Sequence, residues 1–361
     1  MLQDYDIIIV GAGLAGLATA YYLTRDLPLK ILLLEKENAV GLHASGKNAA
    51  MLRQAVPNRE IAAFIQETLR NLENPAEDWS QQVLLKQCGS LLLGTQRSLM
   101  PLHQSLEAVG GTAAIYPFGK FPNQLPQTLQ TQLLASNYEF MLYTPRDGIV
   151  DVQALLQSLL KSSQQKGTCV RLGEAVKALN FKDHVWNVLS SQNQYRAPIV
   201  VNAAGAWAPQ LASAAGGLGE KMQAFRRHLY LSSACEMAVD AWPLVWNINE
   251  EFYFRSQQNK LLLSAGDEEA HSSLDSQEDP HVLNMLREKA KRLFPALQEI
   301  PIEQSWACLR TKTNSGNFFI DWDKQVKNLF WVSALGGHGV GASLGVGRQA
   351  AEKILKNESL R

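Results

Sequence analysis

The sequence predicts an α/β protein in which a parallel sheet with covering helices is interrupted by a second domain built on a large, mostly antiparallel sheet. One observation is an apolar run at 6–10, directly before the glycine-rich segment GAGLAG. A second apolar run, PIVVNAAGAW, lies at 198–207. Continuous apolar runs of this kind are typical of parallel strands buried on both faces. Between about 225 and 320, the runs RRHLYLS, EEFYFRS and KLLLSAG accompany a single helical segment, which indicates an inserted antiparallel domain.

The first forty residues predict a strand, a glycine turn, a helix, a second strand and an acid. This is the Rossmann-like unit that binds dinucleotides. Gly11 makes the tight turn, Gly13 lets the backbone approach a pyrophosphate, and Gly16 lets the helix pack close to the strand. Glu35 lies nineteen residues after Gly16, where an acid accepts hydrogen bonds from ribose hydroxyls. The motif does not separate NAD from FAD.

Later elements are predicted from periodicity and from turn residues. Helical spacing covers 61–74, and the proline-rich stretch 117–126 indicates a surface loop. Asp151 is the expected N-cap of the helix that follows it. The run 198–207 ends in small residues and glycine. We therefore expect its strand beside the first strand, with its carboxyl end at the cofactor.

Residues 336–347 read GGHGVGASLGVG, with six glycines between an apolar run and a helix-like tail at 347–357. Only fourteen residues follow Gly347, too few for a second phosphate-binding unit. We expect the backbone and the helix start at 336–342 to face the reactive ring of the cofactor. A reduced flavin is an anion at its N1–C2=O edge, which favours FAD. A flexible start to a C-terminal helix is the alternative interpretation.

Composition excludes several classes of function. The chain has 361 residues with 34 basic and 34 acidic side chains, so no charge excess indicates a nucleic-acid partner. Its four cysteines (Cys88, Cys169, Cys235 and Cys308) lie far apart, which argues against a metal site or a disulfide framework. No run reaches the length of a transmembrane segment, and no secretory signal is recognised, so we expect a cytoplasmic protein.

GAGLAG with Glu35, GLHASGKNAAMLRQ, VVNAAGAW, WACLRT and GGHGVG occur in the order found in the D-amino-acid oxidase superfamily, which the chain resembles over nearly its whole length. Within it the chain is most similar to D-arginine dehydrogenases, and it is also similar to glycine and sarcosine oxidases. The resemblance implies a GR2-type FAD-binding domain at 1–80, 145–222 and 325–361. It places the substrate-binding domain at 81–144 and 223–324.

The resemblance also implies roles for individual residues. Arg310 in WACLRT matches an arginine that binds the substrate carboxylate, and the bidentate fork of arginine suits that role. Arg227 matches a second arginine of that pocket, and Tyr253 matches a tyrosine beside the substrate. Gly337 matches a glycine whose carbonyl faces the substrate amine, and His43 a residue beside the flavin ring. Arg227 could instead be an exposed strand residue, Tyr253 could pack the sheet, and His43 could be a loop histidine.

The cofactor-binding residues that we expect come from these same segments. They are Gly11, Gly13, Leu14, Ala15, Gly16, Glu35, Lys36, Ala44, Ser45, Val176, Ala204, Gly205, Trp207, Arg310, Gly336, Gly337, His338, Gly339 and Val340.

Some residues depart from the pattern of the similar enzymes. His338 stands where the D-arginine enzyme has tyrosine, and Lys47 and Asn48 also differ from it, so a preference for basic side chains does not follow. Cys308 falls where sarcosine oxidase has the cysteine linked to its flavin. Because isolated cysteines usually pack as small core residues, we predict non-covalent FAD.

The resemblance implies an FAD-dependent amino-acid dehydrogenase or oxidase acting on a D-amino acid or a related amine. Hydride would leave the substrate Cα for flavin N5, and the resulting imine would hydrolyse to an oxo acid and ammonia. A 2-hydroxy-acid dehydrogenase of the same fold is one alternative, and a flavin-binding subunit without turnover is another. The partner expected is a small-molecule substrate, and the electron acceptor stays open.

Overall fold

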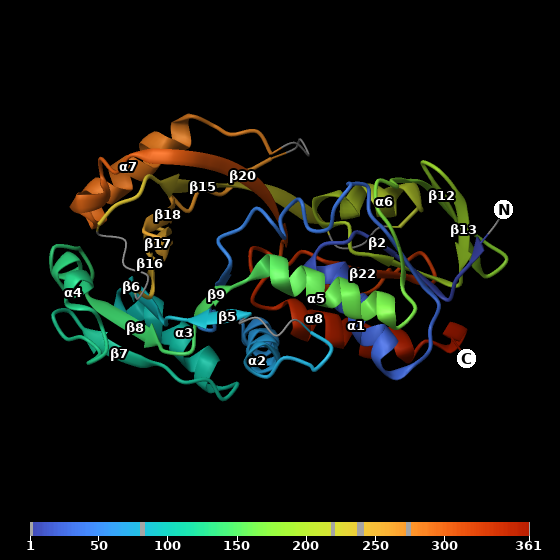
Figure 1. The fold of residues 1–361 in the computed structure, drawn as a ribbon, viewed down its shortest axis with the longest axis horizontal. Helices are drawn as coiled ribbons and strands as arrows, with labels where there is room; N and C mark the ends of the chain where they lie inside the picture. The colour runs from blue at the N-terminus through green and yellow to red at the C-terminus, as the bar shows by residue number, and fades with distance from the viewer. Residues whose placement is uncertain (1–2, 80–83, 218–220, 237–241, 272–275, 361) are drawn as a thin grey trace.

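The computed structural model describes residues 3–79, 84–217, 221–236, 242–271 and 276–360. Figure 1 shows the parallel sheet with its helices at one end of the long axis and the large antiparallel sheet at the other. The predicted fold class is confirmed. The expected domain boundary at 80 and 81 lies outside the described residues.

The first sheet is the parallel one and carries the N-terminal strand at its centre. In spatial order its strands are β10 (Cys169–Arg171), β3 (Ile31–Leu34), β2 (Ile7–Val10), β14 (Ile199–Asn202), β22 (Leu329–Ser333) and β21 (Phe319–Trp322). All four side chains of β2 are buried, as a strand covered on both faces requires. β14 runs parallel to β2, as expected for the run 198–207. β21 pairs antiparallel with β22 in this sheet, although the expected boundary at 324 assigned it to the second domain.

Helices cover the first sheet, and two of them meet closely. These helices are α1 (Leu14–Asp26), α2 (Arg59–Glu73), α5 (Val152–Gln165) and α8 (Ser343–Leu355). The helix after Asp151 is capped as predicted, because the Asp151 carboxylate accepts from the Ala154 N–H at 2.9 Å. α8 begins earlier than its sequence indicates and includes Gly345 and Gly347. A Cβ at Gly347 would lie 2.6 Å from the Cβ of Ala18 on α1, so close helix packing outweighs the low helix propensity of glycine.

The large sheet is mostly antiparallel and forms the second domain. Its strands are β19 (Glu269–Ala270), β15 (Met222–Ser232), β18 (Lys260–Ser264), β17 (Phe252–Gln257), β16 (Leu244–Asn247), β6 (Ser90–Gly94), β8 (Phe140–Thr144), β7 (Ala114–Pro117) and, paired with β15, β20 (Ile302–Thr313). β15 and β20 are its longest strands, and they extend from this sheet towards the first one (Figure 1).

The remaining elements join or cover the two sheets. A sheet beside the first consists of β1 (Gln3–Asp4), β13 (Gln194–Ala197), β12 (Val185–Ser190) and β11 (Val176–Lys182). Another contains β4 (Met51–Leu52), β9 (Gly148–Val150) and β5 (Leu85–Gln87). The other helices are α3 (Gln96–Glu107), α4 (Gln127–Leu134), α6 (Ala208–Ala214) and α7 (His281–Leu293), with 3-10 turns η1 (Gly205–Trp207), η2 (Pro295–Leu297) and η3 (Glu358–Leu360).

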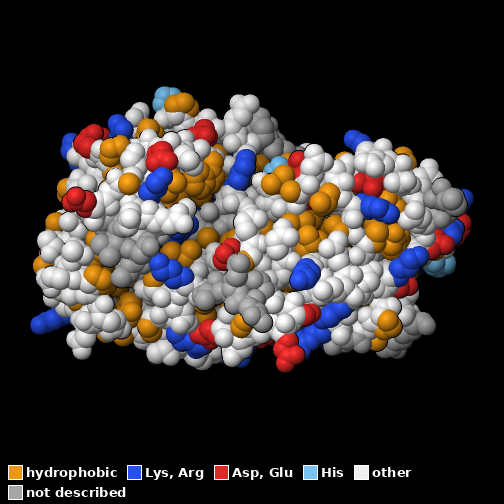
Figure 2. All heavy atoms as spheres, viewed as in Figure 1, with side chains coloured by type: hydrophobic (Ala, Val, Ile, Leu, Met, Phe, Trp, Pro, Cys, Tyr) orange, Lys and Arg blue, Asp and Glu red, His pale blue; other side chains and the backbone are white. Residues whose placement is uncertain are grey.

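The surface has no single dominant charge. On the face shown in Figure 2, basic and acidic side chains are interspersed, in keeping with equal numbers of the two in the sequence. Of the helices in the described ranges, none is both long and apolar enough to cross a membrane.

Candidate functional site

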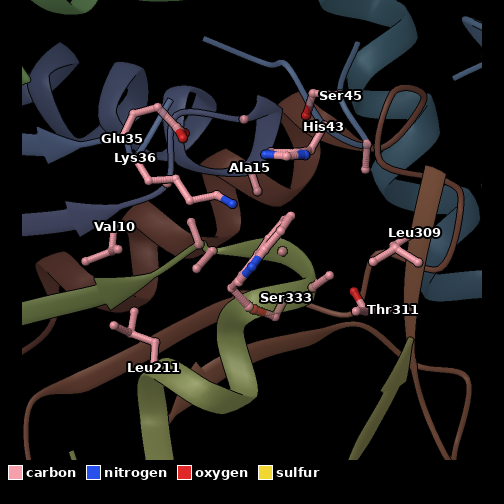
Figure 3. Close-up of a pocket in the computed structure, with 18 of the residues that line it drawn as sticks. Val10, Ala15, Glu35, Lys36, His43, Ser45, Leu211, Leu309, Thr311 and Ser333 are labelled. Carbon is pink, nitrogen blue, oxygen red and sulfur yellow. The ribbon is translucent and has the colours of Figure 1, made fainter. Parts of the chain in front are cut away.

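A cavity of about 420 Å³ lies at the carboxyl ends of the parallel strands and reaches the end of β20. In Figure 3, Glu35 and Lys36 lie on one side of it, and Leu309 and Thr311 of β20 on the other. The expected residues that line it are His43, Gly11, Gly13, Leu14, Ala15, Glu35, Lys36, Ala44, Ser45, Val176, Ala204, Gly205, Trp207, Arg310, Gly336, Gly337, Gly339 and Val340. Gly16, His338, Arg227 and Tyr253 are not among its lining residues.

The glycine turn before α1 brings main chain against main chain. Gly11 has φ +108°, and a Cβ at Gly16 would lie only 2.0 Å from the Gly11 carbonyl oxygen. At Gly13 a Cβ would lie 2.9 Å from the Ser45 Oγ. That hydroxyl also accepts from the Leu14 N–H at 2.9 Å, at the N-terminus of α1. The start of α1 is therefore open to the cavity, with first-turn amides that the helix itself does not satisfy.

Acidic and aromatic side chains form the wall around Glu35. The Glu35 carboxylate accepts from the Ala12 N–H at 2.8 Å and from the Glu37 N–H at 3.0 Å, which fixes its direction. Lys36 Nζ lies 3.6 Å from the centroid of a Trp207 ring, and the rings of His43 and Trp207 are 4.5 Å apart. Glu37, which the sequence did not single out, lies 2.9 Å from His43 Nε2. This hydrogen bond lowers the pKa of Glu37.

The C-terminal glycine segment presents unpaired amides to the cavity. Within the described ranges, the N–H groups of Gly337, Gly339 and Val340 donate no hydrogen bond, and all three residues line the cavity. The first turn of α8 does not contribute in this way, because the N–H groups of Leu344 and Gly345 donate to the Thr68 hydroxyl. The donors expected from the helix start therefore come from the loop before the helix.

Arg310 lies at the β20 end of the cavity, beneath the glycine loop. Its Nη2 is 3.4 Å from the Tyr253 hydroxyl, so the structure brings these two expected residues together. A Cβ on Gly337, which has φ +89°, would lie 2.9 Å from Arg310 Nη1. The positive φ favours glycine here, and a side chain at this position would displace the guanidinium.

Arg227 lies on the same face of the sheet, deeper than Arg310. Its partner on β20 is Cys308, two positions from Arg310. Only 3% of Arg227 is exposed; its Nε donates to the Asp267 carbonyl at 2.5 Å, and its Nη2 is 3.6 Å from a Glu268 carboxylate oxygen. Its Nη1 has no partner in the described part of the chain. The exposed-strand alternative for Arg227 is therefore wrong.

The structure adds a cation that sequence reasoning missed. Arg53, which follows β4, has its guanidinium carbon 4.3 Å from the centroid of the Trp246 ring. The rings of Trp246 and Tyr253 are in turn 4.4 Å apart. Arg53 belongs to the segment GLHASGKNAAMLRQ that carried the resemblance, and a charge directly after an apolar strand was the available signal.

His338 is held neutral among these cations. Burial, followed by the charges of Arg53, Arg310 and Lys312, lowers its pKa to about 3. Lys312 Nζ is paired with the Glu268 carboxylate at 2.5 Å.

A comparison with known protein families matches almost the whole chain to one family. The sequence model of the DAO family, described as FAD dependent oxidoreductase, matches residues 6–353. The chain is 23% identical to FAD-dependent oxidoreductase domain-containing protein 1 of Bos taurus, over 97% of this chain and 81% of that protein. It is 24% identical to 4-methylaminobutanoate oxidase (formaldehyde-forming) of Paenarthrobacter nicotinovorans, over 96% of this chain and 43% of that enzyme.

Solved structures share the fold at lower identity. L-proline dehydrogenase from P. horikoshii superposes with a TM-score of 0.85 at 17% identity, covering 99% of this chain and 94% of that chain. Glycine oxidase from Geobacillus kaustophilus superposes with a TM-score of 0.81 at 19% identity, covering 99% and 96%. These likenesses concern the overall fold.

Proposed function

The chain belongs to the DAO family of FAD-dependent oxidoreductases, and from this premise we propose that it oxidises an amino acid or a related amine at the carbon that bears the nitrogen. The observation that carries the proposal is the Arg310 guanidinium. It lies at the end of the cavity, and no carboxylate oxygen of the described residues comes within 4.0 Å of it. Arg310 is partly buried, and a cation withdrawn from water without an anionic partner is unfavourable, so a ligand carboxylate is the expected counter-ion.

The residues present fit FAD. The bare backbone at Gly11, Gly13 and Gly16 leaves space against the start of α1 for a pyrophosphate, and Glu35 lies where ribose hydroxyls would reach it. At the other end, the free amides of the glycine loop suit the anionic edge of a reduced flavin. The expected cofactor residues that line this cavity are accordingly proposed as the FAD-binding set.

The chain's own residues then position the substrate. Arg310 holds the carboxylate through two charge-assisted hydrogen bonds, and Tyr253 stands beside it with its hydroxyl 3.4 Å from the guanidinium. Gly337 closes over Arg310 and presents main chain to the substrate nitrogen. Bound FAD supplies the acceptor for the hydride that leaves the substrate carbon. Fixing the carboxylate aligns that carbon with the acceptor, which is how these residues contribute to rate.

Relatives with amine substrates support the reaction type. 4-Methylaminobutanoate oxidase and dimethylglycine dehydrogenase are named for secondary and tertiary amines, and glycine oxidase for an amino acid. L-2-hydroxyglutarate dehydrogenase is also similar, at 24% identity over 58% of this chain, which keeps a 2-hydroxy acid as the second candidate substrate. The D configuration implied by the likeness to D-arginine dehydrogenases is part of the proposal.

One anaerobic screen tests these points together. The purified protein should be yellow with about one FAD per chain, and its flavin absorbance should bleach with an amino acid or N-methylated amine. Enantiomer pairs decide the configuration, and matched 2-hydroxy acids decide the reacting group. If hydroxy acids alone bleach the flavin, the substrate is a 2-hydroxy acid and the proposed amine oxidation is wrong. Failure of every amine and hydroxy acid would favour a flavin-binding subunit without turnover.

A further inference from the structure

A second cation beside Arg310 also lacks an anionic partner. Arg53 donates to the Ala55 carbonyl at 3.1 Å through Nη1, and no carboxylate oxygen in the described ranges lies within 4.0 Å of it. Glu251 and Asp147 attract it from farther away, while Arg310 repels it. Arg53 is not among the residues that line the cavity of about 420 Å³. Its stack on Trp246, and that ring's contact with Tyr253, connect it to the hydroxyl that Arg310 contacts.

The charges around His338 leave an excess of positive charge. Arg53, Arg310 and Lys312 all act on this imidazole, which stays neutral. Glu268 is paired with Lys312 and also lies 3.6 Å from Arg227, so it is already occupied. Of these three cations, Arg53 and Arg310 have no carboxylate oxygen within 4.0 Å among the described residues, although Glu268 attracts Arg310 from farther away. A substrate with a cationic side chain would therefore be repelled in the neighbourhood of Arg310.

Arg53 is held in place before any ligand arrives. Asp147 accepts from both the backbone N–H and the side-chain amide of the next residue, Gln54, at 3.0 and 2.7 Å. Gln66 donates to Gln54 Oε1 at 2.6 Å, so the loop after β4 is fixed from two directions. With its guanidinium stacked on Trp246, Arg53 loses little further freedom on binding an anion.

We propose that the substrate carries a second anionic group, which Arg53 binds while Arg310 holds the carboxylate next to the reacting carbon. The substrate class is thus an amino or imino dicarboxylate, and not a basic amino acid such as arginine. The inference rests on the proposed function, because it assigns Arg310 to the first carboxylate. It makes Arg53 a specificity-determining residue for the length and charge of the substrate side chain.

Ligand binding without turnover tests the assignment. Holoenzyme is titrated with glutarate, pentanoate and 5-aminopentanoate, which share five carbons and differ in the charge at the far end, and Kd is read from the flavin absorbance. Dicarboxylates of three to six carbons scan the spacing. We expect the best dicarboxylate to bind at least about thirty-fold more tightly than the monocarboxylate of the same length, because it forms one further charge-assisted pair. We expect 5-aminopentanoate to bind most weakly.

Variants separate the two arginines. Arg53→Met should abolish the preference for the dicarboxylate and leave the Kd of pentanoate unchanged, whereas Arg310→Met should weaken both ligands. Arg226→Met, on the opposite face of β15, is the control and should change neither. Arg53→Gln serves in the same way if Arg53→Met retains less FAD than wild type. Equal weakening of both ligands in the Arg53 variants, or no preference in wild type at any length, would overturn the inference.

Flavin reduction keeps the two proposals distinct. If dicarboxylates bind selectively through Arg53 but no amine bleaches the flavin, amine oxidation is wrong and the dianion site stands. If neutral or basic amino acids bleach it faster than amino dicarboxylates do, amine oxidation stands and the second anionic group is wrong.

Discussion

Arg310→Met is the most direct test of the carboxylate anchor. The substitution keeps the length of the side chain and removes its charge. Within the described ranges the Arg310 side chain makes only weak polar contacts, with the Tyr253 hydroxyl at 3.4 Å and with the Cys308 thiol. The fold therefore has little to lose, and FAD content should stay at the wild-type level.

The loss should instead appear when the substrate is present. A carboxylate left in the cavity without its guanidinium forfeits a bidentate charge-assisted contact, which typically amounts to about 2–5 kcal/mol. At about 1.4 kcal/mol per tenfold, the efficiency of flavin reduction should fall roughly thirty-fold or more. Because Arg53 remains, part of the attraction for a dianionic substrate persists, so the loss should be larger for a substrate with one carboxylate.

Anaerobic stopped-flow reduction measures this directly, with the observed rate followed over substrate concentration. Arg226→Met is the matched control, because Arg226 lies next to Arg227 in sequence but pairs with Glu269 and Asp279 away from the cavity. Normal FAD content with wild-type efficiency in Arg310→Met would refute the anchor, and with it the main residue-level support for a carboxylate substrate.

Cys308 should leave FAD non-covalently bound, because burial raises the pKa of its thiol; acid precipitation should release all flavin, and colour kept in the pellet but lost in Cys308→Ser would contradict this. Gly347→Ala should lower the free energy of unfolding by about 1–2 kcal/mol, since overpacking against Ala18 exceeds the gain in helix propensity. Urea denaturation measures this against the exposed variant Lys356→Ala, and unchanged stability would show that α1 and α8 separate freely. Burial raises the pKa of Asp147 from 3.8 to about 6, so folding loses stability as pH rises through this interval. Asp147→Asn should therefore gain about 3 kcal/mol relative to wild type between pH 4 and 7 in the same assay, and a difference independent of pH would be the opposing result.

Local sequence signals were enough for the N-terminal part of the first sheet. β2, α1 and β3 follow one another within 34 residues, and each has its own apolar pattern or glycine turn. The start of α8 could not be read in this way. Its glycines indicate a loop by propensity, and only the close approach of α1 explains why Gly347 is helical. The parallel pairing of β16 with β6 likewise joins segments about 150 residues apart, which no local pattern encodes.

The candidate site divides in the same manner. The residues of the glycine turn and Glu35 belong to a motif with fixed spacing, so sequence alone selects them. Arg310 came from a resemblance, and the structure gives it a physical setting beside Tyr253. Arg53 belongs to no spacing rule, because its relation to the site depends on a ring that lies 193 positions away, in Trp246.

The route of the chain through the first sheet sets when the protein can acquire its cofactor. The glycine turn from Gly11 to Gly16 lies within the first 16 residues, but β2 needs β14 as a neighbour, and α1 packs against α8. Contacts between such distant segments form late and slowly. We therefore expect the pyrophosphate site at the start of α1 to stay incomplete until α8 has been synthesised, and FAD to bind after that. A nascent chain halted before Ser343 would contain the complete glycine turn and Glu35, and we expect it to bind no flavin.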